Sequence, residues 1–137
     1  SATLAGLLPE LAGQAGGAEL IASLESGRLG RALGRMERAS ATAFTGVLPP
    51  AVAAAALLGT DPRTAKGPLS DLPDSGAVRI LQTMSATGAA RALQYVHPVR
   101  IADLFRRLPR RRADAMLRQL PGPVRLPVQR ELDRDGR

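Results

Sequence analysis

Hydrophobic residues recur every twelve positions along most of this chain. The series is polar once, at Thr60, and is otherwise apolar: Leu24, Met36, Leu48, Leu72, Met84, Val96, Leu108, Leu120 and Leu132. Cutting the chain after each of these residues gives ten units of twelve, from residues 13–24 to residues 121–132. In these units the fifth position is mostly alanine, and the eighth and ninth are usually apolar. Positions five, eight, nine and twelve are spaced as i, i+3, i+4 and i+7, which predicts an amphipathic helix in each unit.

The first two positions of the units hold residues that start helices. They are Pro49, Pro50, Asp61, Pro62, Pro73, Ser85, His97, Pro98, Pro109, Pro121 and Asp133. Proline suits a first turn because its missing N–H has no partner to lose there, and Ser or Asp can cap exposed N–H groups. One continuous helix would turn its apolar face by about 120° per unit, so no single face could be buried. We therefore expect a helix of about eight to ten residues per unit, then a short turn.

We expect these helices to stack into an α-solenoid. A helix of this length is marginal alone in water, so each one must pack against its neighbours. The small alanine at position five lets helix axes approach closely, while the larger apolar residues interlock. Two units form one helical hairpin of 24 residues, which is within the usual range for helical repeats. The sequence therefore predicts an all-α fold on a 12-residue repeat.

Three parts of the chain depart from the repeat. The unit over residues 61–72 contains Lys66-Gly67-Pro68, and its proline predicts a short turn and a loop there. Residues 59–67 are interpreted as a hinge or seam. In the last unit Pro123 and Pro127 predict a helix that begins near Pro127 and runs to about Asp133. Residues 1–24 fit the repeat poorly and are expected to form a partly irregular N-terminal cap on a repeat domain over residues 25–137.

Basic residues are concentrated in the C-terminal third. The formal net charge is +7, and residues 97–137 hold eleven arginines against five acids. Six arginines surround one helix junction and are the candidate partner-binding residues: Arg106, Arg107, Arg110, Arg111, Arg112 and Arg118. Such a cluster attracts an acidic protein, nucleic acid or an anionic surface. The alternative is that these arginines only solvate the outer faces of short helices.

The residue types needed for most catalytic sites are missing or scattered. His97 is the single histidine and there is no cysteine, so no histidine-based metal cluster or Cys/His pair can be built, and we expect no enzyme. His97 is interpreted as a helix-start residue. Carboxylates in two groups could hold Mg²⁺ weakly, although helix capping and solvated termini are the simpler explanations: Asp71 with Asp74, and Glu131 with Asp133 and Asp135.

No stretch has the length of apolar sequence needed for a membrane span, and no secretion signal is recognisable. The absence of cysteine fits a cytoplasmic protein. Both observations lead us to expect a cytoplasmic segment.

The segment His97-Pro98-Val99-Arg100-Ile101-Ala102-Asp103-Leu104-Phe105-Arg106-Arg107-Leu108-Pro109 resembles the opening helix of the cytosolic N-terminal domain of MgtE-type magnesium transporters. The specific similarity covers about residues 97–133, and the looser rhythm extends it back to about residue 25. The resemblance implies a right-handed superhelix of short helices, similar to modules in the flagellar motor switch protein FliG, that contacts and regulates partners. In those transporters acidic surfaces of the domain help to sense magnesium together with CBS domains.

This chain departs from that family in charge. Positions where the family tends to carry acids hold Arg100, Arg106, Arg107, Arg110 and Arg111, which is the wrong sign for an ion-sensing face. We therefore expect a non-catalytic interaction or regulatory module that docks an acidic partner or a neighbouring domain through its arginine-rich C-terminal units. The alternatives are a magnesium-responsive regulatory domain of a transporter and a helical repeat that binds duplex nucleic acid.

Overall fold

The computed structural model describes residues 27–134, and every regular element in that range is a helix. Residues 27–35 are helical, and eight helices follow: α3 (Arg38–Gly46), α4 (Pro50–Leu58), α5 (Pro62–Asp71), α6 (Asp74–Gln82), α7 (Ala86–Leu93), α8 (Pro98–Arg106), α9 (Arg110–Gln119) and α10 (Gly122–Arg134). All eight begin at the second position of a twelve-residue unit. The predicted all-α fold and its repeat are therefore confirmed. The cap predicted for residues 1–24 lies outside the described residues.

The apolar positions of the repeat form the core, as predicted. The alanines at position five are buried: Ala41, Ala53, Ala65, Ala77, Ala89 and Ala113. Positions eight and nine supply most of the large buried side chains, including Leu57, Leu69, Ile80, Leu81, Leu93, Leu104, Phe105 and Met116. Burying one such side chain stabilises the fold by about 1.5–3 kcal/mol. Even Thr60, the polar exception at position twelve, is buried.

Side chains at position one cap several helices. Asp61 accepts a hydrogen bond from the N–H of Arg63 at 2.8 Å, and the Oγ of Ser85 accepts one from the N–H of Gly88 at 3.0 Å. The Nδ1 of His97 accepts a hydrogen bond from the N–H of Val99 at 3.1 Å, so its predicted role as a helix-start residue is confirmed. Asp133 does not follow this rule, because it lies within the last turn of α10.

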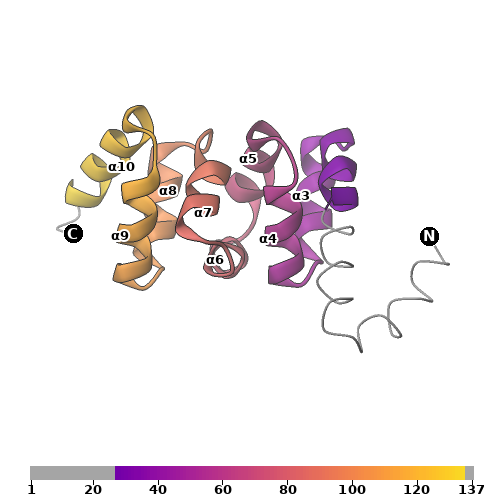
Figure 1. Ribbon diagram of the computed structural model, residues 1–137, viewed down its shortest axis with the longest axis horizontal. Helices are drawn as coiled ribbons and strands as arrows, with labels where there is room; N and C mark the ends of the chain where they lie inside the picture. Colours follow the sequence, from indigo (N-terminus) through magenta and orange to yellow (C-terminus); the bar gives the residue numbers. More distant parts are fainter. Residues whose placement is uncertain (1–26, 135–137) are drawn as a thin grey trace.

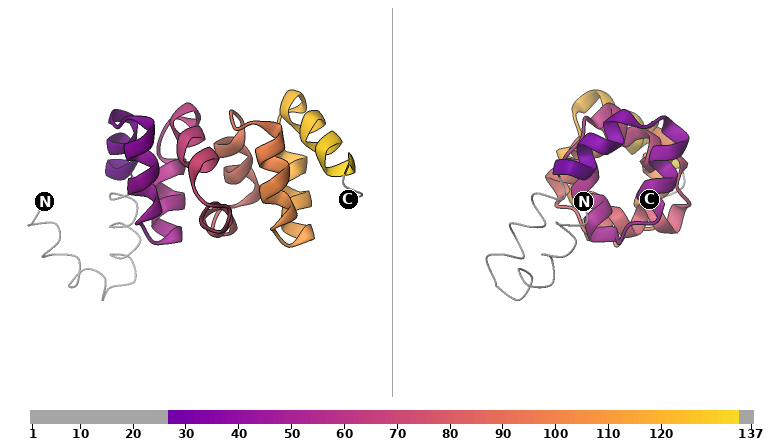
Figure 2. Two further views of the ribbon diagram at one scale, coloured as in Figure 1. Left: turned by 180° about the vertical axis from the view of Figure 1, so that it is seen from behind. Right: turned by 90° about the vertical axis from the view of Figure 1, so that its right-hand side faces the viewer.

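The helices form a superhelical α-solenoid. They follow one another along the long axis of the molecule (Figure 1), and the view along that axis shows them arranged around it in a ring (Figure 2, right). Each helix packs on the helix two units away, so that α3, α5, α7 and α9 form one series and α4, α6, α8 and α10 the other. The 24-residue hairpin is therefore the unit that stacks. The right-handed twist implied by the family resemblance stays a prediction.

Two predictions based on proline were wrong. Helix α5 runs through Pro68 without a loop, and α10 begins at Gly122 and continues through Pro127. Pro68 occupies the apolar eighth position and is buried, and α5 ends three residues later, so burial offsets one missing backbone hydrogen bond. In α10 Pro123 lies in the first turn, where proline is tolerated, and Val128 is buried after Pro127.

The predicted seam at residues 59–67 divides between a turn and a helix. Gly59 follows the end of α4, whereas residues 62–67 belong to α5. The backbone of Gly59 lies against Gly30, where an added Cβ would lie 2.6 Å from the Gly59 carbonyl oxygen. Glycine at position 30 is therefore required for this close approach. Bending of the chain at the seam stays a prediction.

Candidate partner-binding surface

Three of the six candidate arginines hold helices together. Arg106 donates to the Asp103 carboxylate at 2.7 Å and to the Glu131 backbone carbonyl at 2.9 Å, which ties α8 to α10. Arg107 pairs with Asp74 at 3.0 Å. Arg112 donates to two backbone carbonyls at the C-terminal end of α6, those of Gln82, its last residue, at 2.8 Å and of Met84 at 2.6 Å. The structure therefore uses these three side chains for packing as well as for charge.

The other three, Arg110, Arg111 and Arg118, are exposed on α9. Within the described part of the chain, none of them forms a hydrogen bond or an ion pair. Arg111 and Arg118 are seven residues apart, so they share one face of α9 and lie about 10 Å apart along its axis. The opposite face of α9 enters the core through Ala113, Met116 and Leu117.

Most of the acidic side chains on the neighbouring helices α8 and α10 already have partners. Asp103 pairs with Arg106, and Glu131 pairs with Arg134 at 3.2 Å. Asp133 accepts a hydrogen bond from Gln129 at 2.9 Å. Asp114 is exposed on α9 between the arginines, and Arg125 and Arg130 add exposed positive charge on α10. The predicted cluster is thus reduced to three outward arginines on a rigid helix.

Sequence reasoning missed a role that Arg100 and Arg112 share. The Nη2 of Arg100 donates to the Leu72 carbonyl at 2.6 Å, and the Nη2 of Arg112 donates to the Met84 carbonyl at 2.6 Å. Both bonds span 28 residues, and both arginines occupy position four of their units. A guanidinium at the carbonyl end of a helix is favourable because it meets free acceptors and the negative end of the helix dipole. The repetition of arginine at position four was the available signal.

The first pair of carboxylates that could hold Mg²⁺, Asp71 and Asp74, lies against arginine side chains. Asp71 accepts two hydrogen bonds from Arg38, at 2.6 and 2.9 Å, and Asp74 pairs with both Arg100 and Arg107. The hydrogen bond from Arg38 lowers the pKa of Asp71, and the same bond raises the pKa of Arg38. Across residues 27–134 there is no group of three or more His, Asp and Glu side chains that could hold a metal ion. Asp135 lies outside the described residues.

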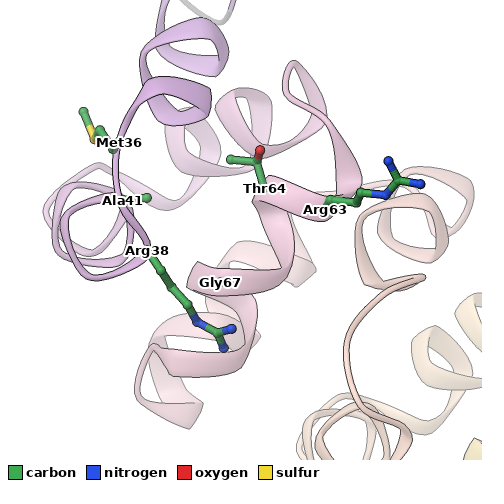
Figure 3. Close-up of a pocket in the computed structure, with 6 residues that line it drawn as sticks. All are labelled: Met36, Arg38, Ala41, Arg63, Thr64 and Gly67. Carbon is green, nitrogen blue, oxygen red and sulfur yellow. The ribbon is translucent and has the colours of Figure 1, made fainter.

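A small pocket between α3 and α5 is lined by both apolar and basic residues. Its volume is about 160 Å³, and Figure 3 shows the residues around it: Met36, Arg38, Ala41, Arg63, Thr64 and Gly67. The Arg38 side chain passes over Gly67, where an added Cβ would lie 3.0 Å from the Arg38 Cγ. Neither a carboxylate nor an imidazole is among the residues that line this pocket beside the Thr64 hydroxyl.

Among the described helices, none is long and apolar enough to cross a membrane. No family model, no curated protein and no solved structure matches the chain.

Proposed function

We propose that this chain is a non-catalytic helical module that docks an acidic protein partner, or an acidic neighbouring domain, through the outward face of α9. One observation carries the proposal. Arg110, Arg111 and Arg118 are exposed, make no recorded bond within the described residues, and sit on a helix whose other face is fixed in the core. The fold thus presents three cations in a fixed arrangement without using them itself.

The strength of exposed ion pairs suggests how this surface acts. A single exposed pair contributes about 0–1 kcal/mol, so one arginine cannot hold a partner. Three arginines on one rigid helix can act together, and each guanidinium can bind a carboxylate through two parallel hydrogen bonds. The positive field also accelerates the encounter with an acidic surface.

Two other functions remain as alternatives. Duplex nucleic acid is favoured by the same exposed cations, because phosphate binding needs only suitably placed positive charge. A magnesium-responsive role in a transporter, as implied by the MgtE-type resemblance, would need carboxylates to meet the ion. Asp71 and Asp74 both face arginines, which disfavours a cation at that position.

The test compares two charge reversals of equal size. Arg110, Arg111 and Arg118 are all changed to Glu in one variant, and exposed Arg28, Arg31 and Arg35 of the other end of the solenoid are changed to Glu in the control. Binding of a labelled polyglutamate peptide and of a labelled DNA duplex is followed by fluorescence anisotropy over a series of salt concentrations. We expect the α9 variant to bind the peptide about tenfold more weakly or worse, and the control to change by about twofold or less.

Equal losses in the two variants would show that only net charge matters and would defeat the docking claim. Tight duplex binding with a steep salt dependence, together with weak peptide binding, would replace the proposal by nucleic-acid binding. The melting temperature of the α9 variant should stay close to that of the parent, because the three arginines form no hydrogen bond or ion pair with residues 27–134. A large fall would show that they are part of the fold instead.

A further inference from the structure

The Arg100 side chain fills a space between two neighbouring hairpins. From α8 it reaches back to the end of α5, where it donates to the carbonyls of Leu69 at 3.1 Å and Leu72 at 2.6 Å. Its guanidinium also pairs with Asp74 at the start of α6. The residues that define this space are therefore Leu72, Asp74 and Arg100 itself.

The same three positions recur one hairpin earlier and one hairpin later, and there they line open pockets. Because the hairpin is 24 residues long, the equivalents are Leu48, Pro50 and Gly76 on one side, and Val96, Pro98 and Val124 on the other. The first three line a pocket of about 230 Å³ and the second three a pocket of about 360 Å³. Gly76 has no side chain, and Val124 is too short to reach across. The length of one side chain thus decides whether the space is filled.

The pocket beside Val124, called the Val124 slot below, combines apolar walls with basic groups. It is lined by Lys66, Gln94, Tyr95, Val96, His97, Pro98, Pro123 and Val124. Lys66 is exposed at its edge, and the Arg63 guanidinium lies 5.4 Å from the centre of the Tyr95 ring. None of these lining residues is acidic. A ligand with an apolar side chain and negative charge fits both the walls and the rim.

A second pocket continues the slot along α7. Its volume is about 240 Å³, it shares Gln94 with the Val124 slot, and Arg91 lines it. The other residues around it are Thr87, Ala90, Gln119 and Pro121. This pocket also lacks an acidic lining residue, so a chain that leaves the slot in this direction meets another cation.

We propose that the Val124 slot docks a short acidic segment of a partner protein, with one apolar side chain inserted and its flanking carboxylates on Lys66 and Arg63. A free cationic ligand would bind this slot less well than an acidic one, because Pro98 stands where Asp74 pairs with Arg100 and Lys66 lies at the rim. A second copy of this chain is also disfavoured, since its net charge is +7 and the two copies would repel each other. The proposal does not depend on the α9 surface.

The test uses two labelled peptides and the intact chain. The first peptide is Glu-Glu-Leu-Glu-Glu, and in the second the leucine is replaced by serine, so that charge is kept and the apolar anchor is lost. Val124→Arg should close the slot as Arg100 closes its own, and the matched control Gly76→Arg fills the equivalent pocket two hairpins away. We expect Val124→Arg to weaken binding of the leucine peptide about tenfold, with about twofold or less for the control.

Lys66→Glu is a second variant that leaves the core untouched, and we expect it to weaken the leucine peptide about fivefold or more. Equal binding of the leucine and serine peptides would overturn the proposal, because the slot would then contribute nothing beyond charge. Unchanged binding in both Val124→Arg and Lys66→Glu would also overturn it. Loss of binding in the α9 charge reversal with these two variants unaffected would support the α9 surface and exclude the slot.

Discussion

The junction between α6 and α8 and the junction between α4 and α6 share one repeat but differ in whether an arginine side chain crosses them. In the first, Arg100 crosses the space, and its side chain is only 18% exposed. In the second, the equivalent residue is Gly76, and a Cβ added there would meet nothing within 4 Å. The backbone framework therefore accepts either an open pocket or an arginine that bonds one helix to another, which we call a tie. Counting arginines in the sequence consequently overestimates the positive charge available to a partner, since several arginines bond to neighbouring helices within the solenoid.

Removing the tie should have the largest effect on stability. In Arg100→Ala two helix-end carbonyls lose their donor and Asp74 keeps only Arg107, so we expect the free energy of unfolding to fall by about 2–3 kcal/mol. Urea denaturation followed by circular dichroism measures this change. Arg118→Ala is the control, with an expected change within about 0.5 kcal/mol because Arg118 is exposed. Similar losses in both variants would remove the distinction between tying and free arginines.

Adding a tie to the open junction should have a smaller, opposite effect. Gly76→Arg places a guanidinium within reach of the Leu48 carbonyl, but Pro50 offers no carboxylate in place of Asp74. We expect a gain of about 1–2 kcal/mol in the free energy of unfolding, part of it from replacing glycine within a helix. Gly76→Ala measures that part alone, at about 0.5–1 kcal/mol. If the arginine variant is no more stable than the alanine variant, the added side chain does not bridge the junction.

The weakest expected effect concerns the exposed tie between α3 and α5. Arg38 and Asp71 are 52% and 41% exposed, so solvent screens their pair and its contribution should be below about 1 kcal/mol. Because the folded pKa of Asp71 is lowered, the stabilisation is complete above the pKa of the unfolded chain and is lost as pH falls through the folded value. Asp71→Asn should therefore reduce the loss of stability between pH 7 and pH 3, measured by urea denaturation at both values.

Asp114→Asn is the matched control for this pH dependence, because Asp114 is an exposed acid with no recorded partner among the described residues. It should leave the difference in stability between the two pH values nearly unchanged. An equal reduction in both variants would assign the pH dependence to the overall charge of the chain and not to the Arg38–Asp71 pair.

The proline errors show the limit of local rules. Local rules interpret Pro68 as a break and Pro127 as the start of a helix, because proline lacks the backbone donor that a helix interior needs. Both lie within continuous helices, and Pro68 shows the reason, since it stands at an apolar position where burial offsets that loss. The caps were easier to predict, because Asp61, Ser85 and His97 bond to backbone groups only two or three residues away.

Periodicity along the chain was enough to place the helix starts and the buried face, since both follow from the spacing of neighbouring residues. It could not separate Arg112, which reaches Met84, from Arg111 beside it, which faces solvent. Nor could it locate the Val124 slot. Those outcomes depend on contacts between residues that are 25 to 33 positions apart in the sequence, on helices of neighbouring hairpins. They also depend on whether a side chain from the next hairpin is long enough to reach across the space between the two hairpins.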